Sequence, residues 1–127
     1  MDKLLQMMGL ARRANLLLAG EEVVADAIAA HKARLVLLAA DASERTGKKI
    51  RQMAGETLPV LVLPAEKDAL GAALGKGSCA VAAVLDGGFA AKLAQMLAQS
   101  NPDYVAVAER LNQKEAKRQR REKEKPR

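Results

Sequence analysis

The sequence predicts a layered α/β fold, and three observations support this class. Residues 16–42 read as one unbroken unit of short strand, helix and longer strand. The runs LVLL at 35–38 and CAVAAVLD at 79–86 show no alternation of polar and apolar residues, which is typical of strands covered on both faces. The segments between these runs place apolar residues at helical spacing, so each is expected to cover one face of a sheet.

The central unit, residues 16–42, predicts a helix that begins after Gly20. Glycine adopts backbone conformations that other residues avoid, and the next two residues, Glu21 and Glu22, suit the positive end of a helix dipole. The apolar positions on one side of this helix are Val23, Val24, Ala27 and Ile28. The pattern fades at His31, so the helix is expected to end there and to pack one face on the sheet.

One helix is predicted before this unit and one after it. The first places Leu4, Leu5, Met8 and Ala11 at helical spacing. It is expected to end at Asn15, with Arg12 and Arg13 near its negative end. Asp41 and Glu44 have the spacing of a capping box at the start of the later helix. That helix, 43–56, is expected to bury Ile50, Met53 and Ala54.

Two further strands and two helices complete the predicted core. Pro59 and Pro64 bound the strand VLVL without interrupting its hydrogen bonds. Gly75 is a plausible left-handed end for the helix 66–74. That helix is expected to face inward with Ala69, Leu70, Ala73 and Leu74. The small residues of 79–86 predict a central strand. The last helix follows Gly87 and Gly88 with a stripe of Phe89, Leu93, Met96 and Leu97.

Residues 1–100 are predicted to form one α/β domain that ends near Asn101. The remaining segment, 101–127, begins with a weakly amphipathic stretch around Leu111. From residue 112 onward it has no apolar residue larger than alanine, so it cannot bury itself and is expected to be a flexible or helical basic tail. The segment has nine basic and five acidic side chains, which is most of the excess positive charge.

The composition excludes several classes of function. A net charge of +6 favours a polyanion as partner, with plain solubility as the alternative. One Tyr, one Phe and no Trp cannot supply the stacking platform of RRM or OB-fold readers of single strands. One Cys and one His provide neither a disulfide nor a metal site. No secretory signal or membrane span is visible, so we expect a cytoplasmic protein with no membrane partner.

The glycine-rich segment GAALGKGS, residues 71–78, is not a P-loop. Only three residues separate its first two glycines, and Lys76 is followed by glycine instead of Ser or Thr. Either the loop of Lys76, Gly77 and Ser78 lets its backbone approach a phosphate closely, or it is simply a tight turn. Both readings stay open.

No pair of nucleophile and base is visible. His31 lies where a helix ends and is explained by capping, and Cys79 opens a buried strand as a small hydrophobe. We therefore expect no enzymatic activity and no cofactor. The strongest indication of a polyanion is the C-terminal run, where a solvated tail is the alternative. Its cations are Lys114, Lys117, Arg118, Arg120, Arg121, Lys123, Lys125 and Arg127.

Several strings resemble the kink-turn-binding superfamily of ribosomal proteins, which includes the archaeal "seven-Ae" protein and its bacterial and eukaryotic relatives. They are LLQMMGLARRANLLLAG, GEEVVADAIAAHKARLVLLAADAS, LPVLVLPAEKDALGAALGK and CAVAAVLD. The similarity covers about residues 3–97 and is greatest to small bacterial members described as ribosomal or RNA-binding proteins. It implies a three-layer α/β/α sandwich around a four-stranded mixed sheet.

The resemblance also implies three RNA-binding turns: into the second helix, into the third helix, and before the last strand. The corresponding positions here are Gly20, Glu21, Glu22 and Val23; Asp41 to Arg45, including Ser43; and Lys76, Gly77, Ser78 and Cys79. Members that clamp tandem sheared G·A pairs use Asn and then Glu where this chain has Glu22 and Val23. They have Lys in place of Asp26 and often Arg in place of Ala30.

These departures put carboxylates where an RNA groove would lie. Binding is therefore expected to rely on the remaining cations. They are Lys76, Arg45 and Lys48, with accessory phosphate contacts from Arg12, Arg13, Lys117, Arg118, Arg120 and Arg121.

The function predicted from the sequence is non-enzymatic binding of structured RNA, and the expected partners are ribosomal RNA and proteins of the translation machinery. One alternative is a protein-interaction module on the same fold, in which the two glutamates meet a basic partner. A second alternative is the remnant of an RNA-modifying enzyme. The lack of a catalytic domain within the 127 residues counts against this alternative.

Overall fold

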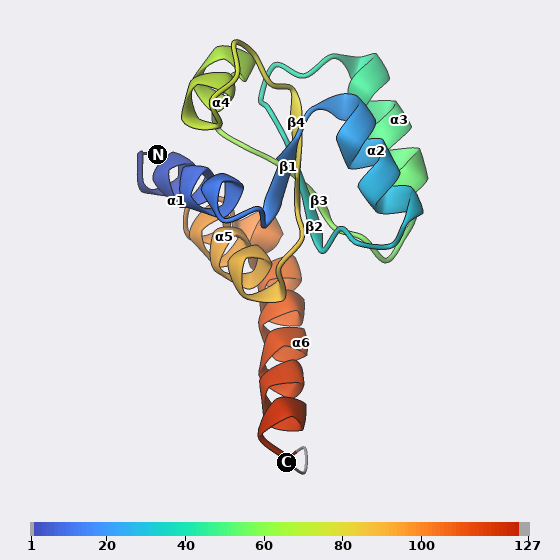
Figure 1. The fold of residues 1–127 in the computed structure, drawn as a ribbon, viewed down its shortest axis with the longest axis vertical. Helices are drawn as coiled ribbons and strands as arrows, with labels where there is room; N and C mark the ends of the chain where they lie inside the picture. The colour runs from blue at the N-terminus through green and yellow to red at the C-terminus, as the bar shows by residue number, and fades with distance from the viewer. Residues whose placement is uncertain (1, 125–127) are drawn as a thin grey trace.

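The computed structural model describes residues 2–124 and has three layers, with helices on both faces of one sheet (Figure 1). The four strands are β1 (Leu17–Ala19), β2 (Leu35–Leu38), β3 (Val60–Val62) and β4 (Val81–Val84). They lie in the order β1-β4-β2-β3. β4 runs antiparallel to both of its neighbours, whereas β2 and β3 are parallel. The predicted α/β sandwich, its mixed sheet and the central place of β4 are confirmed.

The helices divide between the two faces of the sheet. Their bounds are α1 (Asp2–Arg13), α2 (Glu21–Ala29), α3 (Glu44–Ala54), α4 (Lys67–Ala73), α5 (Gly87–Ser100) and α6 (Val105–Glu124), with a 3₁₀ turn, η1 (Pro102–Tyr104), before α6. In Figure 1, α2 and α3 cover one face while α1, α4 and α5 cover the other. α6 packs on α5 and then projects away from the sheet.

β2 shows why its sequence has no polar alternation. Leu35 and Leu37 enter the core beneath α1, α4 and α5, whereas Val36 and Leu38 enter the core beneath α2 and α3. All four side chains are buried. A strand in this position needs apolar residues on both faces, as the sequence predicted.

Three predicted helix ends have left-handed backbone conformations. Asn15 follows α1 with φ +62°, His31 follows α2 with φ +56°, and Gly75 follows α4 with φ +75°. This conformation stops a helix and turns the chain toward the next strand.

The predicted core positions Val23, Met53 and Ala69 are wrong. Val23 is 43% exposed, Met53 is 38% exposed, and Ala69 is also exposed. Each lies at the margin of a helix face whose central residues already fill the contact with the sheet; on α2 those residues are Val24, Ala27 and Ile28. The contacting stripe is therefore narrower than the apolar stripe in the sequence.

The prediction that nothing beyond residue 112 is buried is wrong at Glu115, which is 9% exposed. Arg118 neutralises its carboxylate through two hydrogen bonds, of 2.6 and 3.1 Å. A Cβ on Gly87, the first residue of α5, would lie 2.5 Å from Glu115 Oε2, so glycine leaves the space that this carboxylate fills. The positive end of the α5 dipole also favours the charge there.

Candidate nucleic-acid interface

The sheet topology brings the three predicted RNA-binding turns to one end of the molecule. β1, β2 and β3 end where β4 begins, because β4 is antiparallel to β1 and β2. The turn at Gly20, the segment 39–43 and the loop 75–80 therefore emerge from the same edge of the sheet, together with the entry to α4 (Figure 1). We refer to these segments as the loop end.

Gly20 shapes the first of these turns. Its φ is +120°, which an L side chain rarely adopts, and its N–H donates to the carbonyl of Val81 at 3.0 Å. A Cβ at this position would lie only 3.1 Å from Nζ of Lys76. The backbone conformation therefore requires glycine, and the absence of a Cβ lets the lysine approach closely.

Lys76 links the glycine loop to this turn. Its ammonium donates a hydrogen bond to the carbonyl of Ala19 at 3.0 Å, directly beside Gly20. An ammonium has three donors, so two remain for an anion at the loop end. The Lys76 side chain is therefore held in place by the backbone of β1, and the predicted approach of the loop backbone to a phosphate stays a prediction.

The glycine loop depends on Gly71, which the sequence predicts only as a helix residue. A Cβ on Gly71 would lie 2.8 Å from the N and Cα atoms of Ser78. The carbonyl of Gly71 also accepts from the N–H of Lys76 at 2.7 Å. By contrast, Gly77 does not have a positive φ, and a Cβ there would meet nothing within 4 Å.

The second turn uses two predicted site residues for structure. Oδ1 of Asp41 accepts from the N–H of Lys67 at 2.7 Å and so caps α4, not α3. Ser43 is the N-cap of α3 and accepts from the N–H of Thr46 at 3.1 Å. The predicted capping box of Asp41 and Glu44 is therefore wrong, because Asp41 is engaged by an element that lies 26 residues later in the chain.

The charges at the loop end are mixed. Arg45 and Lys48 are exposed on α3, where they are available to phosphates. Glu21 faces Lys49 at 4.0 Å in a largely solvated pair, which contributes little to stability. Glu22 and Asp26 are exposed on α2, and no ion pair to either is present within residues 2–124.

Two of the accessory cations, Arg12 and Arg13, lie at the end of α1. Burial raises the pKa of the Cys79 thiol, and its hydrogen bond to the carbonyl of Val81 and the charge of Lys76 oppose this effect. Arg12 is partly buried near the end of α1, which leads into the start of β1. Arg13 is exposed at the end of α1.

The predicted tail contacts do not lie beside the loops. Lys117, Arg118, Arg120 and Arg121 are on α6, which projects from the opposite end of the molecule in Figure 1. Arg118 is further occupied by Glu115 and Glu122. The accessory phosphate contacts expected of the tail stay a prediction, and they lie away from the loop end; Lys125 and Arg127 lie outside the described residues.

Two other kinds of site are absent from the described part of the chain. Residues 2–124 contain no group of three His, Cys, Asp or Glu side chains that could hold a metal ion. None of the helices described within this range is long and apolar enough to cross a membrane. Cys79 is buried in the core, as its position in the sequence predicted.

Comparisons with known proteins agree with this arrangement of elements. The model of the ribosomal protein L7Ae/L30e/S12e/Gadd45 family matches residues 2–94. RNA-binding protein YlxQ of Bacillus subtilis (strain 168) is 37% identical over 91 residues, which cover 72% of this chain and 91% of that protein. RNA-binding protein YlxQ of Enterococcus faecium is 34% identical over 97 residues, covering 76% and 92%.

Solved structures also resemble the chain. A protein with unknown function from Bacillus halodurans C superposes with a TM-score of 0.69 and is 41% identical, covering 75% of this chain and 96% of that one. The 15.5kD RNA binding protein of Giardia lamblia superposes with a TM-score of 0.61 at 20% identity, covering 72% and 82%. The second likeness shows the shared fold.

Proposed function

The chain belongs to the ribosomal protein L7Ae/L30e/S12e/Gadd45 family, and from this membership we propose that it is a non-enzymatic RNA-binding protein. Its curated relatives are named as RNA-binding proteins and not as enzymes. The proposal is supported most directly by the position of Lys76 at the loop end, where its ammonium lies over the Gly20 turn with two donors available. The RNA proposed is structured and kink-turn-like, such as a ribosomal RNA met in the cytoplasm with the translation machinery.

The loop end suits recognition by shape and phosphates. The absence of a side chain at Gly20 lets RNA approach the backbone, and the ammonium of Lys76 can contact a phosphate in the same place. Val23 lies beside this turn with 43% of its surface exposed, so it can pack against a base. Its exposure at the loop end gives a functional reason for an apolar residue that contributes little to the core.

The exposed carboxylates of Glu22 and Asp26 oppose RNA phosphates. We therefore propose that affinity depends on Lys76, Arg45 and Lys48 and is modest compared with that of relatives that have Asn and Lys at the two acidic positions. Glu22→Asn should consequently raise the affinity for kink-turn RNA, because it removes one like charge from the interface.

The test measures affinity for a kink-turn RNA and for a matched duplex that lacks the G·A pairs, over a salt series. We expect tighter binding of the kink-turn, weaker binding by Lys76→Gln, and no change for Lys92→Gln, whose exposed lysine on α5 lies outside the loop end. Equal affinity for the two RNAs would overturn kink-turn recognition. Equal losses in the two variants would overturn the role of the loop end.

A protein-interaction module is the second candidate, and the exposed acidic face of α2 favours it. Glu22 and Asp26 would pair with a basic protein surface as readily as they would repel RNA. Isolation of the protein from cells with and without RNA digestion separates the two candidates. Partners retained after digestion would support the protein-interaction function, and partners lost with the RNA would support RNA binding.

A further inference from the structure

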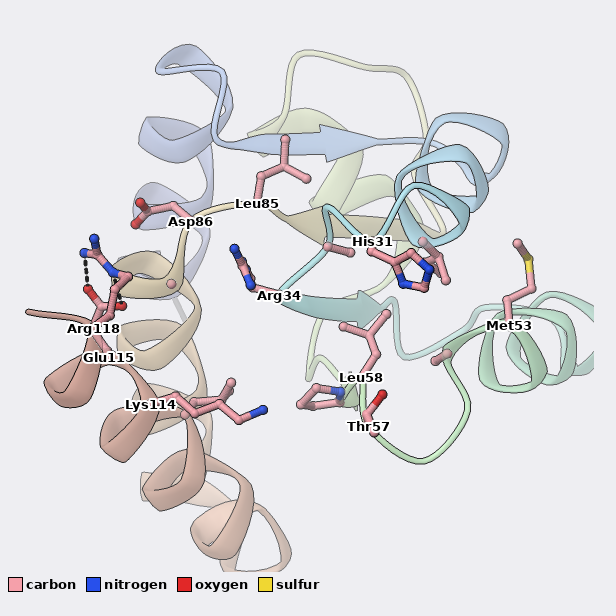
Figure 2. Close-up of a pocket in the computed structure, with 16 residues that line it drawn as sticks. His31, Arg34, Met53, Thr57, Leu58, Leu85, Asp86, Lys114, Glu115 and Arg118 are labelled. Atoms are coloured by element: carbon pink, nitrogen blue, oxygen red, sulfur yellow. Dashed lines mark hydrogen bonds and ion pairs between the residues drawn. The ribbon is translucent and has the colours of Figure 1, made fainter. Parts of the chain in front are cut away.

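A groove of about 670 Å³ opens at the end of the sheet opposite to the loop end (Figure 2). Its walls come from the segments that precede β2 and β3, the segment that follows β4, the end of α3, and α6. β2 runs from the groove to the loop end, and an extended chain from Arg34 to Ala40 spans roughly 20 Å, so the two ends of the sheet are about that far apart. The groove is thus distinct from the surface assigned to structured RNA.

Two cations in this groove lack a partner. The side chains of Arg34 and Lys114 are exposed and make no hydrogen bond or ion pair with any residue between 2 and 124. In Figure 2, Arg34 lies at the centre of the groove and Lys114 extends across it from α6 toward Leu58.

The other charged groups in the groove are already engaged. Arg118 binds Glu115 and Glu122, and Asp86 accepts from the N–H of Phe89 as the N-cap of α5. Asp86 keeps its negative charge in that hydrogen bond, so the lining has one net positive charge, from Arg34, Lys114 and Arg118 against Asp86 and Glu115. Arg34 and Lys114 are the two cations without a bonded partner among residues 2–124.

The remaining lining is largely apolar. It includes Ile28, Ala54, Leu58, Pro59, Leu85 and Leu111. A nucleotide of a single strand has both a flat base with little charge and an anionic phosphate, so it matches an apolar floor with cations beside it. A duplex hides its bases and presents phosphates on a convex surface, which gains nothing from a concave floor. The guanidinium of Arg34 can also stack on a base, which the shortage of aromatic residues makes useful.

We propose that this groove binds a single-stranded segment of RNA, with phosphates at Arg34 and Lys114 and bases against Leu58 and Leu85, which lie on either side of Arg34. Along α6, Lys117 and Arg121 lie three and seven residues after Lys114, so they continue the row of cations beyond the groove. The inference extends the proposed function: structured RNA lies at the loop end and an adjoining unpaired strand lies at the groove. The predicted tail contacts then have a role, although they are remote from the loops.

The experiment uses the full chain and three RNAs: a kink-turn, the same kink-turn with about ten unpaired uridines, and the uridine strand alone. Arg34→Gln with Lys114→Gln removes the two cations, and Lys3→Gln with Lys92→Gln is the control with the same net charge. Both control lysines are exposed and outside the groove. Thermal unfolding verifies that both double variants fold.

We expect the extension to raise affinity about tenfold, and the groove variant to abolish this gain while keeping the affinity for the unextended kink-turn. The slope of log affinity against log salt concentration should be smaller by about 1.4 for the groove variant with the extended RNA. Each single-strand phosphate that is no longer neutralised lowers this slope by about 0.7. The proposal would be overturned if the unpaired extension did not raise the affinity, or if the groove variant kept the higher affinity for the extended RNA. Displacement of the strand by poly-glutamate at equal charge concentration would also overturn it, because the groove would then suit an acidic protein.

Failure of the proposed function gives a different result. If the kink-turn alone is not bound while the uridine strand is bound through Arg34 and Lys114, the groove is supported and kink-turn recognition is refuted. If the kink-turn is bound and the unpaired extension does not raise the affinity, kink-turn recognition is supported and the groove proposal is refuted.

Discussion

Replacing Gly71 by alanine should destabilise the protein, although alanine is the better helix former. The added Cβ would lie 2.8 Å from the N and Cα atoms of Ser78 and 2.9 Å from the carbonyl carbon of Gly77. These are backbone atoms, so the loop that carries Lys76 must shift. Overpacking of this kind costs about 1–3 kcal/mol. The gain in helix propensity is about 1 kcal/mol, so a net loss of about 1 kcal/mol remains.

Gly47→Ala is the matched control, because Gly47 is also a buried glycine inside a helix. Its Cβ would meet the guanidinium of Arg51 at 3.0 Å, which can move aside, and Leu38 Cδ1 at 3.8 Å. This variant should therefore be stabilised by up to about 1 kcal/mol. Urea unfolding measures both free energies, and the Gly71 variant should also melt a few degrees lower, roughly 2–8 °C.

RNA affinity supplies the second measurement. The Gly71 carbonyl accepts from the N–H of Lys76, so movement of the loop displaces the ammonium from the Gly20 turn. The Gly71 variant should bind kink-turn RNA severalfold more weakly, while the Gly47 variant should bind normally. If both glycine variants were stabilised alike, the close approach of Gly71 to Ser78 would not constrain this position.

Three further predictions concern individual side chains. Lys76→Gln should lower the salt slope of RNA binding by about 1, and an unchanged slope would exclude a phosphate contact there. Tyr104→Phe should cost about 1 kcal/mol of unfolding free energy, because the hydroxyl accepts from the N–H of Val62 on an edge strand; an unaltered urea midpoint would contradict this. The hydrogen bond from Arg118 lowers the pKa of Glu115 from its usual value of 4.5, so this pair adds stability above that pH and loses it as pH falls through the lowered pKa. Arg118→Gln should therefore destabilise the protein more at neutral than at acid pH. An equal loss of unfolding free energy at the two pH values would contradict a stabilising Arg118–Glu115 pair.

The elements of the fold could be predicted because their signals are local. The apolar run of β2, the glycine that opens α2 and the left-handed residue Asn15 each act within a few residues. The buried residues at the margins of the helix faces were predicted less accurately, because the apolar stripe of a helix does not show how much of it contacts the sheet. Val23 and Met53 were assigned to the core on that basis and are exposed.

The candidate site was only partly predictable. The glycine loop and the Gly20 turn were both recognised, but the hydrogen bond from Lys76 to Ala19 joins residues that are 57 positions apart. Asp41 was assigned to the start of α3, yet its carboxylate caps α4. Gly71 gave no sign of its role, because what requires a glycine there is a loop that crosses α4.

Local sequence patterns were enough to predict which segments form strands and helices, the burial of the sheet on both faces and the cationic character of the C-terminal segment. Each depends on periodicity, composition or a backbone preference that short segments express on their own. Long-range strand pairing brings three distant turns to one end of the sheet and leaves the cations of α6 at the opposite end beside Arg34. Those relations follow from strand order and direction, which long-range pairing sets and local residues do not encode.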